Sequence, residues 1–131
     1  MYRVTTTLSV SIAGGHTVTA SSDVIEAEAI DQLDIELAAD DTPITVEIQP
    51  GASSQLHALL LSSTHYASDL TYVFNDGTTD ADETLTLDGP QIFSAGNLGA
   101  ISVNPTHIIL TMASTGEAAT VSIFVARDAT P

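Results

Sequence analysis

The segment FNDGTTDADETLTL, residues 74–87, holds the densest group of side chains suited to binding a cation. Calcium takes six to eight oxygen ligands, which proteins supply mainly from carboxylates on a tightly folded loop. The spacing of the acids in this segment does not match the EF-hand loop. Residues 75–77, Asn-Asp-Gly, are typical turn residues instead. We therefore expect a turn, and the candidate metal ligands, if the loop binds a cation, are Asp76, Asp80, Asp82 and Glu83.

Four histidines form a second possible metal set, and they are spread along the chain as His16, His57, His65 and His107. No two of them stand at i, i+2 or i, i+4, the spacings that place ligands on one strand face or one helix face. The chain also lacks cysteine, which excludes disulfides and thiolate metal sites. We expect structural or exposed histidines and no bound metal.

Motifs of catalytic sites are missing as well. There is no G-x-S-x-G nucleophile elbow, and Gly14 and Gly15 have no lysine nearby to meet a phosphate. Paired carboxylates of the kind that glycosidases use are inevitable in so acidic a chain and therefore decide nothing. Only three tyrosines and three phenylalanines are present, which leaves little for a sugar-binding platform. The sequence predicts a protein that is not an enzyme and needs no cofactor.

Charge restricts the partners further. Seventeen acidic residues face two basic ones, Arg3 and Arg127, for a net charge of −15. Such a charge argues against binding to nucleic acid or to an anionic membrane, because both require cations on the protein. It is also compatible with a salty environment, where screening makes dense carboxylates tolerable. No secretory signal or membrane-spanning run is visible, so synthesis in a cytoplasm is the default expectation.

Alternating apolar and polar residues predict strands along most of the chain. Residues 7–12 place Leu8, Val10 and Ile12 on one face, which is typical of a half-buried strand. Gly14-Gly15 then predicts a tight hairpin with a primed turn. Residues 24–33 contain good helix formers, so a helix stays open there as the alternative to an extended segment. Residues 89–99 are expected to be loop-rich. In all, we predict an all-β, antiparallel β-sandwich, jelly-roll or Ig-like, of eight or nine short strands in a single domain, residues 1–131.

The order of these segments resembles small structural proteins encoded in the head and tail gene clusters of tailed bacteriophages. A hairpin, TTTLSVSIAGGHTVTA, is followed by PITVEI, LHALLLSSTHYASDLTYVFND and DETLTLDGPQIF, and the chain closes with THIILTMASTGEAATVSIFVARDATP. The likeness covers most of the chain. LLLSS…DLTYVFND and GEAATVSIFVARDATP are its most similar parts.

This resemblance implies a viral structural protein without catalytic residues. By analogy with capsid cement (decoration) proteins, it implies a homo-oligomer, with a trimer favoured, bound to the major capsid protein on the outer surface of the phage head. Met1 to Val4, with Arg3 opposite a shell carboxylate, would then form the contact surface together with exposed loops. The alternatives are a tail or baseplate component, and a bacterial sugar- or calcium-binding adhesion module.

Overall fold

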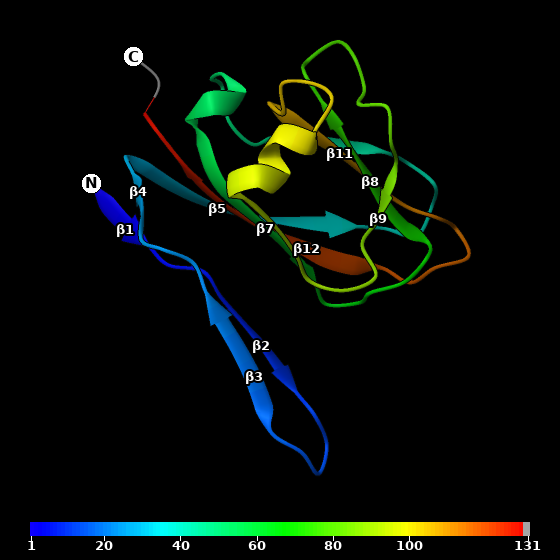
Figure 1. The fold of residues 1–131 in the computed structure, drawn as a ribbon. Helices are drawn as coiled ribbons and strands as arrows, with labels where there is room; N and C mark the ends of the chain where they lie inside the picture. Colours follow the sequence, from blue (N-terminus) through cyan, green and yellow to red (C-terminus); the bar gives the residue numbers. More distant parts are fainter. Residues whose placement is uncertain (130–131) are drawn as a thin grey trace.

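Two packed β-sheets form the body of the protein, and a long β-hairpin projects from it (Figure 1). The computed structural model describes residues 1–129, and Ala95 and Gly96 by their backbone alone. Within these residues the chain is all-β, with no α-helix, which confirms the predicted fold class, although it has twelve strands and not the eight or nine expected. No helix among them has the length and hydropathy of a membrane span. The predicted single domain extends to residue 131, and its last two residues lie outside the described part.

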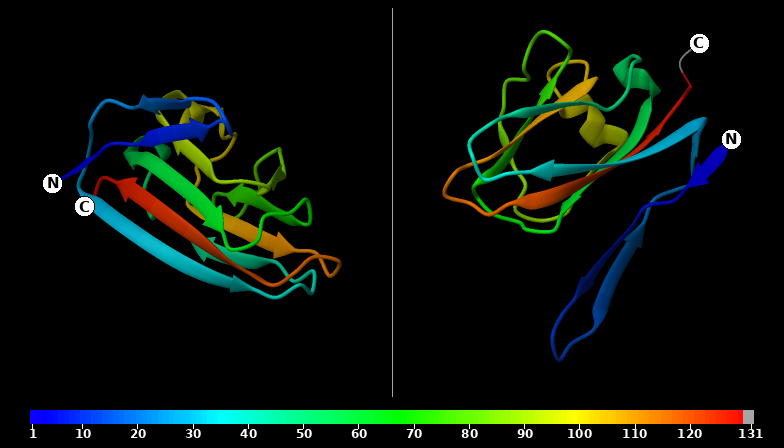
Figure 2. Two further views of the ribbon diagram at one scale, coloured as in Figure 1. Left: turned by 90° about the horizontal axis from the view of Figure 1, so that it is seen from below. Right: turned by 180° about the vertical axis from the view of Figure 1, so that it is seen from behind.

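The body consists of two four-stranded antiparallel sheets. The first sheet has the strand order β10 (Gln91–Ser94), β7 (Leu56–Ser63), β12 (Ala119–Arg127) and β5 (Ala29–Leu37). The second sheet contains β6 (Ile44–Glu47), β11 (His107–Met112), β8 (Leu70–Asn75) and β9 (Leu85–Thr86). The two sheets lie face to face in the views of Figure 2.

Strand pairing in the body is nested. The first of its eight strands, β5, pairs with the last, β12, and the second, β6, pairs with the seventh, β11. Inside these, β7 pairs with β10, and β8 pairs with β9. Along the chain, β5, β6, β7 and β8 lie alternately in the first and the second sheet, and so do β9, β10, β11 and β12, starting from the second. This is the connectivity of a jelly roll, in which two Greek keys are folded over one core, so the pairing selects the first of the two predicted sandwich types.

The core follows from the alternation of the body strands. Along β11 and β12 every second side chain is buried between the sheets, as their sequence pattern predicts. Aliphatic residues fill most of this space, and aromatic rings meet at one end of it. There the ring of Phe74 makes edge-to-face contacts with Tyr72 (5.7 Å between centroids) and with Phe93 (5.2 Å).

The structure decides one open alternative and changes one expectation for individual segments. Residues 24–33 are extended, in β4 (Ile25–Ala27) and the start of β5, so the helical alternative does not occur. The segment expected to be loop-rich contains the strand β10, which pairs with β7, before the 3-10 helix η2 (Ala95–Ala100). A second 3-10 turn, η1 (Ser53–Gln55), precedes β7. Strand β10 was missed because its four residues, QIFS, are too few to display a period.

The projecting hairpin consists of β2 (Thr7–Ser11) and β3 (Thr17–Ser21), and we call it the arm. It is joined to the body by a short ribbon of β1 (Tyr2–Val4) and β4. Every residue of both arm strands is exposed, so the expectation of a half-buried strand at residues 7–12 is wrong. The alternation in sequence reflects a real apolar face, but nothing in residues 1–129 covers that face.

The hairpin itself was predicted at the right place. The N–H of Gly15 donates a hydrogen bond to the carbonyl oxygen of Ile12 (2.9 Å) and closes the turn. Only Gly14 has a positive φ there, 74°, at the third position of the turn. This is the pattern of a type II turn, not of the primed turns that were expected.

Candidate functional site

The acidic segment at residues 75–83 folds as a turn whose polar groups bond to one another. Asp76 Oδ1 accepts hydrogen bonds from the N–H of Thr78 (2.9 Å), the N–H of Thr79 (2.7 Å) and the Thr78 hydroxyl (3.1 Å). These backbone hydrogen bonds stabilise the ionised carboxylate and lower the pKa of Asp76 below its ordinary value. Asn75 Oδ1 also accepts the N–H of Gly77 (2.6 Å). The turn that the sequence predicts at this position is therefore present.

The other three candidate ligands extend along the same loop. Asn75 Nδ2 donates to Asp80 Oδ1 (2.8 Å), and the backbone N–H of Asp82 donates to the Ser102 hydroxyl (2.9 Å). Glu83 is exposed. Within residues 1–129 no three His, Asp or Glu side chains stand together in a way that could hold a metal ion.

The strongest grouping of catalytic residue types surrounds His57. Its Nε2 lies 2.8 Å from Asp128 Oδ1, and the two side chains are 28% and 35% exposed. A hollow of about 450 Å³ beside the imidazole is lined in part by Ser53 and Ser54. A serine nucleophile requires a hydrogen bond to the imidazole that activates it, and no such bond joins either serine to His57 among the described side chains. The sequence could not suggest this His–Asp pair, because 71 positions separate the two residues.

The remaining histidines lie in unrelated places. His65 Nδ1 is 3.5 Å from Glu117 Oε2 at the surface. His107 Nδ1 is 2.7 Å from the Thr106 hydroxyl at the start of β11. His16 lies just after the turn of the arm and is exposed.

The arm has the most unusual surface of the molecule. Its strand register pairs Val10 with Val18 and Leu8 with Ala20, which places these side chains on one face together with Ile12. The large ones remain 50–60% exposed: Leu8 57%, Val10 60%, Ile12 50% and Val18 50%. The opposite face carries only hydroxyl side chains, such as the Thr7–Ser21 pair (3.2 Å between oxygens). The arm is thus an amphipathic ribbon.

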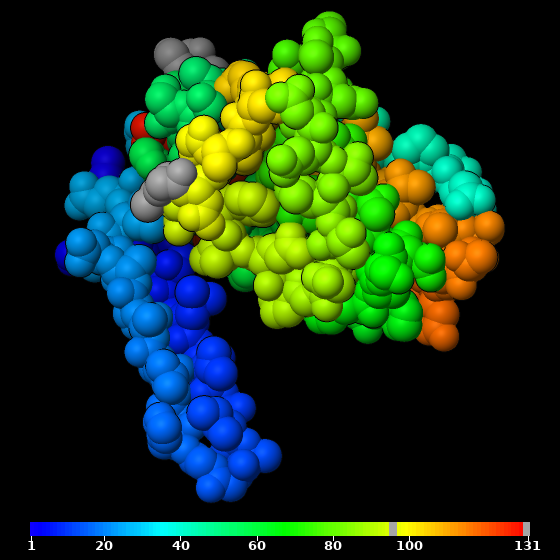
Figure 3. All heavy atoms as spheres, turned by 45° about the vertical axis from the view of Figure 1, so that its right-hand side comes forward, coloured from blue at the N-terminus to red at the C-terminus, as the bar shows by residue number. Residues whose placement is uncertain are grey.

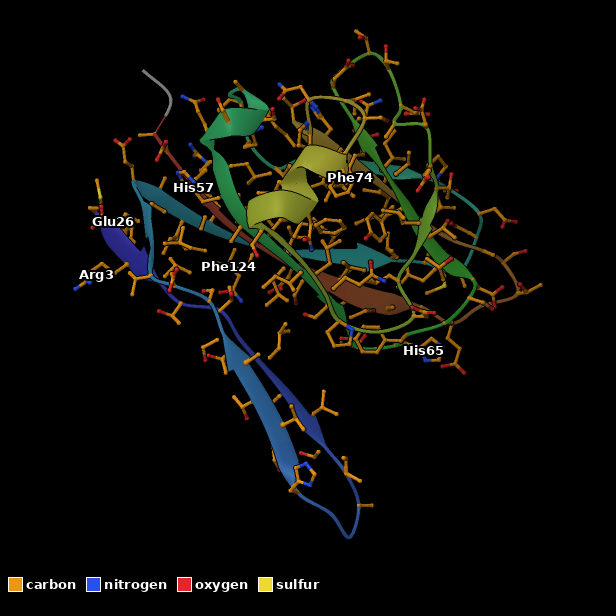
Figure 4. The ribbon with its side chains drawn as sticks, in the orientation of Figure 1. Arg3, Glu26, His57, His65, Phe74 and Phe124 are labelled. Carbon is orange, nitrogen blue, oxygen red and sulfur yellow. The ribbon has the colours of Figure 1, made fainter. Side chains whose placement is uncertain are left out.

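The outer face of the first sheet continues this apolar surface. Ile92, Leu60 and Phe124 are cross-strand neighbours on β10, β7 and β12, and we call them the outer patch. Their neighbours along each strand point into the core, while Leu60 is itself 38% exposed. The outer patch, residues 58–59 and residues 4–8 line one cleft of about 320 Å³. The side chain of Phe124 lies near the base of the arm (Figure 4).

The β1–β4 ribbon covers the adjoining part of that sheet face. Ala27, Ala58 and Ala126 form a small buried cluster, against which Val4 and Ile25 pack. Arg3, the proposed contact residue, is on the other side of this ribbon: it is exposed and stands opposite Glu26 in the register. Figure 4 shows both side chains at the end of the molecule, away from the arm's tip.

Family models and curated proteins provide no further guide to this surface. No protein-family model matches the sequence, and no curated protein is similar to it at a significant level.

Proposed function

We propose that this protein is a structural component of a tailed-phage virion, a cement protein that binds the outside of the head. The observation that carries the proposal is the exposed apolar face of the arm. A two-stranded hairpin is marginally stable in water unless a further layer packs on it. A chain that keeps such a hairpin is suited to a role in which an assembly covers it, as in a virion, and the resemblance described above names that assembly.

The charge distribution supports the same role. The net charge of −15 repels packaged DNA and keeps the free protein soluble before assembly. The jelly roll is compatible with the proposal, since viral capsid proteins use it, but lectins and cupins do too. The fold alone therefore does not choose between these roles.

The N-terminal ribbon offers a contact with the shell, separate from the arm. Arg3 is one of only two basic residues in the chain. The other, Arg127, is held by Asp31, with Nε 3.0 Å from Oδ2. No ion pair within the described residues involves Arg3, so its guanidinium is available to a carboxylate of the major capsid protein.

The test is the location of the protein in purified virions of the phage that encodes it. Mass spectrometry of gradient-purified particles should detect the chain, and gold-labelled antibody should mark the head surface in electron micrographs. Labelling confined to the tail would overturn the proposal in favour of a tail or baseplate component. Detection only in infected cytoplasm would remove the virion role altogether.

A second experiment tests the contact between the N-terminal ribbon and the shell. Heads made without the gene should lose DNA at a lower temperature, and adding the purified protein should restore them. We expect Arg3→Glu protein to bind such heads at least about tenfold more weakly, because it places like charge opposite a carboxylate. Arg3→Lys, which keeps the charge, is the matched control. Equal binding by both variants would exclude Arg3 from the contact.

A further inference from the structure

We infer that the arm of one copy of this chain docks on the outer patch of a second copy, so that the protein assembles by exchanging arms. The inference concerns the purified chain alone and is therefore tested separately from any place in a virion. It commits to a second copy as the occupant of the arm's apolar face. Charge, position and area support that choice.

Charge favours a second copy over an oppositely charged partner. Residues 4–22 contain no Asp, Glu, Lys or Arg, although the whole chain carries −15. The outer patch consists of uncharged side chains as well. Two copies repel each other over most of their surfaces. The arm and the outer patch are surfaces at which two copies approach without bringing carboxylates together, whereas a basic partner would gain nothing from a neutral ribbon.

Position makes the two surfaces complementary. Leu8, on the apolar face of the arm, lines the same cleft as Leu60, Ile92 and Phe124 of the sheet. The arm then leaves the body, and an open notch separates the two beyond the arm's base (Figure 3). The arm of a single chain consequently touches the outer patch only at its root. A second arm entering this notch would cover the outer patch with the apolar face that its own body leaves bare.

Area indicates that the exchange is mutual. The paired strands of the arm, five residues each, form a face about 17 Å long and about 10 Å wide at the usual strand dimensions. One such face is far smaller than the roughly 800 Å² per partner that a stable interface of standard size buries. A copy that both gives an arm and receives one buries about twice this area, which brings the interface closer to that size. We therefore expect a closed symmetric oligomer, a two-fold pair or a ring, in which each copy does both.

The first measurement is the mass of the full-length protein in solution from about 1 to about 100 μM, by light scattering and sedimentation, at moderate salt. We expect a defined oligomer. Val10→Asp should weaken it at least about tenfold, because the interface would bury a charge. Ser9→Asp is the matched control, since it places the same charge on the opposite face of the same strand and should leave the mass unchanged. Leu60→Asp should act like Val10→Asp, with Ser62→Asp, farther along β7 on the same outer face, as its control.

A second measurement identifies which surfaces meet. The chain has no cysteine, so single cysteines give an unambiguous result. A mixture of Val10→Cys protein and Leu60→Cys protein should form a disulfide-linked heterodimer under mild oxidation, and Ser9→Cys in place of Val10→Cys should form much less. A wild-type protein that stays monomeric throughout the concentration range would overturn the inference. So would an oligomer unaffected by Val10→Asp, or cross-linking of Val10→Cys only to itself, which would indicate arms paired with each other.

Discussion

At the scale of single residues, the Tyr72 hydroxyl is a polar group at the edge of the core that makes a hydrogen bond between the two sheets. The ring of Tyr72 is buried, with 1% of the residue exposed, and its hydroxyl donates a hydrogen bond to Gln91 Oε1. Gln91 Nε2 in turn donates to the backbone carbonyl oxygen of Thr86 (2.7 Å). The bond between the two side chains connects β8 in one sheet with β10 in the other, and Gln91 extends the connection to the backbone of β9.

Removing that hydroxyl should destabilise the fold. In Tyr72→Phe, Gln91 Oε1 loses its donor inside the protein, and an unpaired group of this kind costs about 1–2 kcal/mol. Chemical denaturation of the wild type and the variant measures the free energy of unfolding. Tyr2→Phe, at a position 52% exposed, is the control and should change it by less than about 0.5 kcal/mol. An equal effect of the two substitutions would contradict the role given to the Tyr72 hydrogen bond.

The same hydroxyl makes stability depend on alkaline pH. Burial raises the pKa of Tyr72 well above its usual value, because the charged phenolate is poorly solvated there. The folded state thus keeps the proton that the unfolded state loses at about pH 10. This contribution is complete below about pH 10 and is lost as the pH rises further. The difference in Tm between the wild type and Tyr72→Phe should therefore narrow above about pH 10, and a constant difference would refute the assignment.

At the scale of elements, the arm and the core strands have the same sequence pattern and opposite surroundings. Val10 in β2 and Ile123 in β12 both occupy the apolar position of an alternating strand, yet Val10 is 60% exposed and Ile123 is fully buried. Periodicity shows which residues share a face of a strand. It does not show whether another layer packs on that face, which is decided by pairing with distant segments.

This contrast predicts that replacing the two side chains by alanine changes the free energy of unfolding by very different amounts. Ile123→Ala should cost about 2–5 kcal/mol, because it leaves a cavity between the sheets. Val10→Ala should change the free energy of unfolding by less than about 0.5 kcal/mol when measured at low protein concentration, where the arm is uncovered. Denaturant titrations of both variants provide the comparison. A large loss of stability in Val10→Ala would mean that the arm packs on its own body.

The sequence was a good guide to local structure and a poor one to long-range arrangement. The strands of the body, the arm's hairpin and the Asn75–Gly77 turn all follow from alternation or from turn residues that act over a few positions. The His57–Asp128 pair, the cleft beside Leu60 and the exposure of the arm depend on which strands become neighbours. Which strands become neighbours depends on the pairing of segments far apart in the chain. Local patterns in a single sequence do not indicate that pairing.

At the scale of the whole molecule, the excess of negative charge sets the response to salt. Seventeen acidic residues on a body of this size repel one another, and folding brings them closer together. Raising NaCl from about 0.05 M to about 1 M shortens the Debye length to about 3 Å and should raise Tm. KCl at the same ionic strength should do the same, because screening does not depend on the cation. A rise that required calcium at low concentration would instead indicate a bound cation, and the loss of that rise in an Asp76→Asn, Asp80→Asn variant would place the cation in the loop that also holds Asp82 and Glu83.

The nested pairing of the jelly roll also determines when this chain can fold. Strand β12, the last of the described strands in sequence, is inserted between β5 and β7, so that Arg127 pairs with Ala29 and Ala119 with Leu37. The first sheet therefore stays incomplete until residues 119–127 have been synthesised, and contacts so distant in sequence form slowly. The arm, in contrast, is a local hairpin whose residues precede those of the body strands, and hairpins of this kind form in microseconds. A nascent chain would therefore expose the apolar face of the arm before the body has folded. Arms on neighbouring ribosomes could then associate, so the yield of folded protein should depend on the rate of translation and on the spacing of ribosomes.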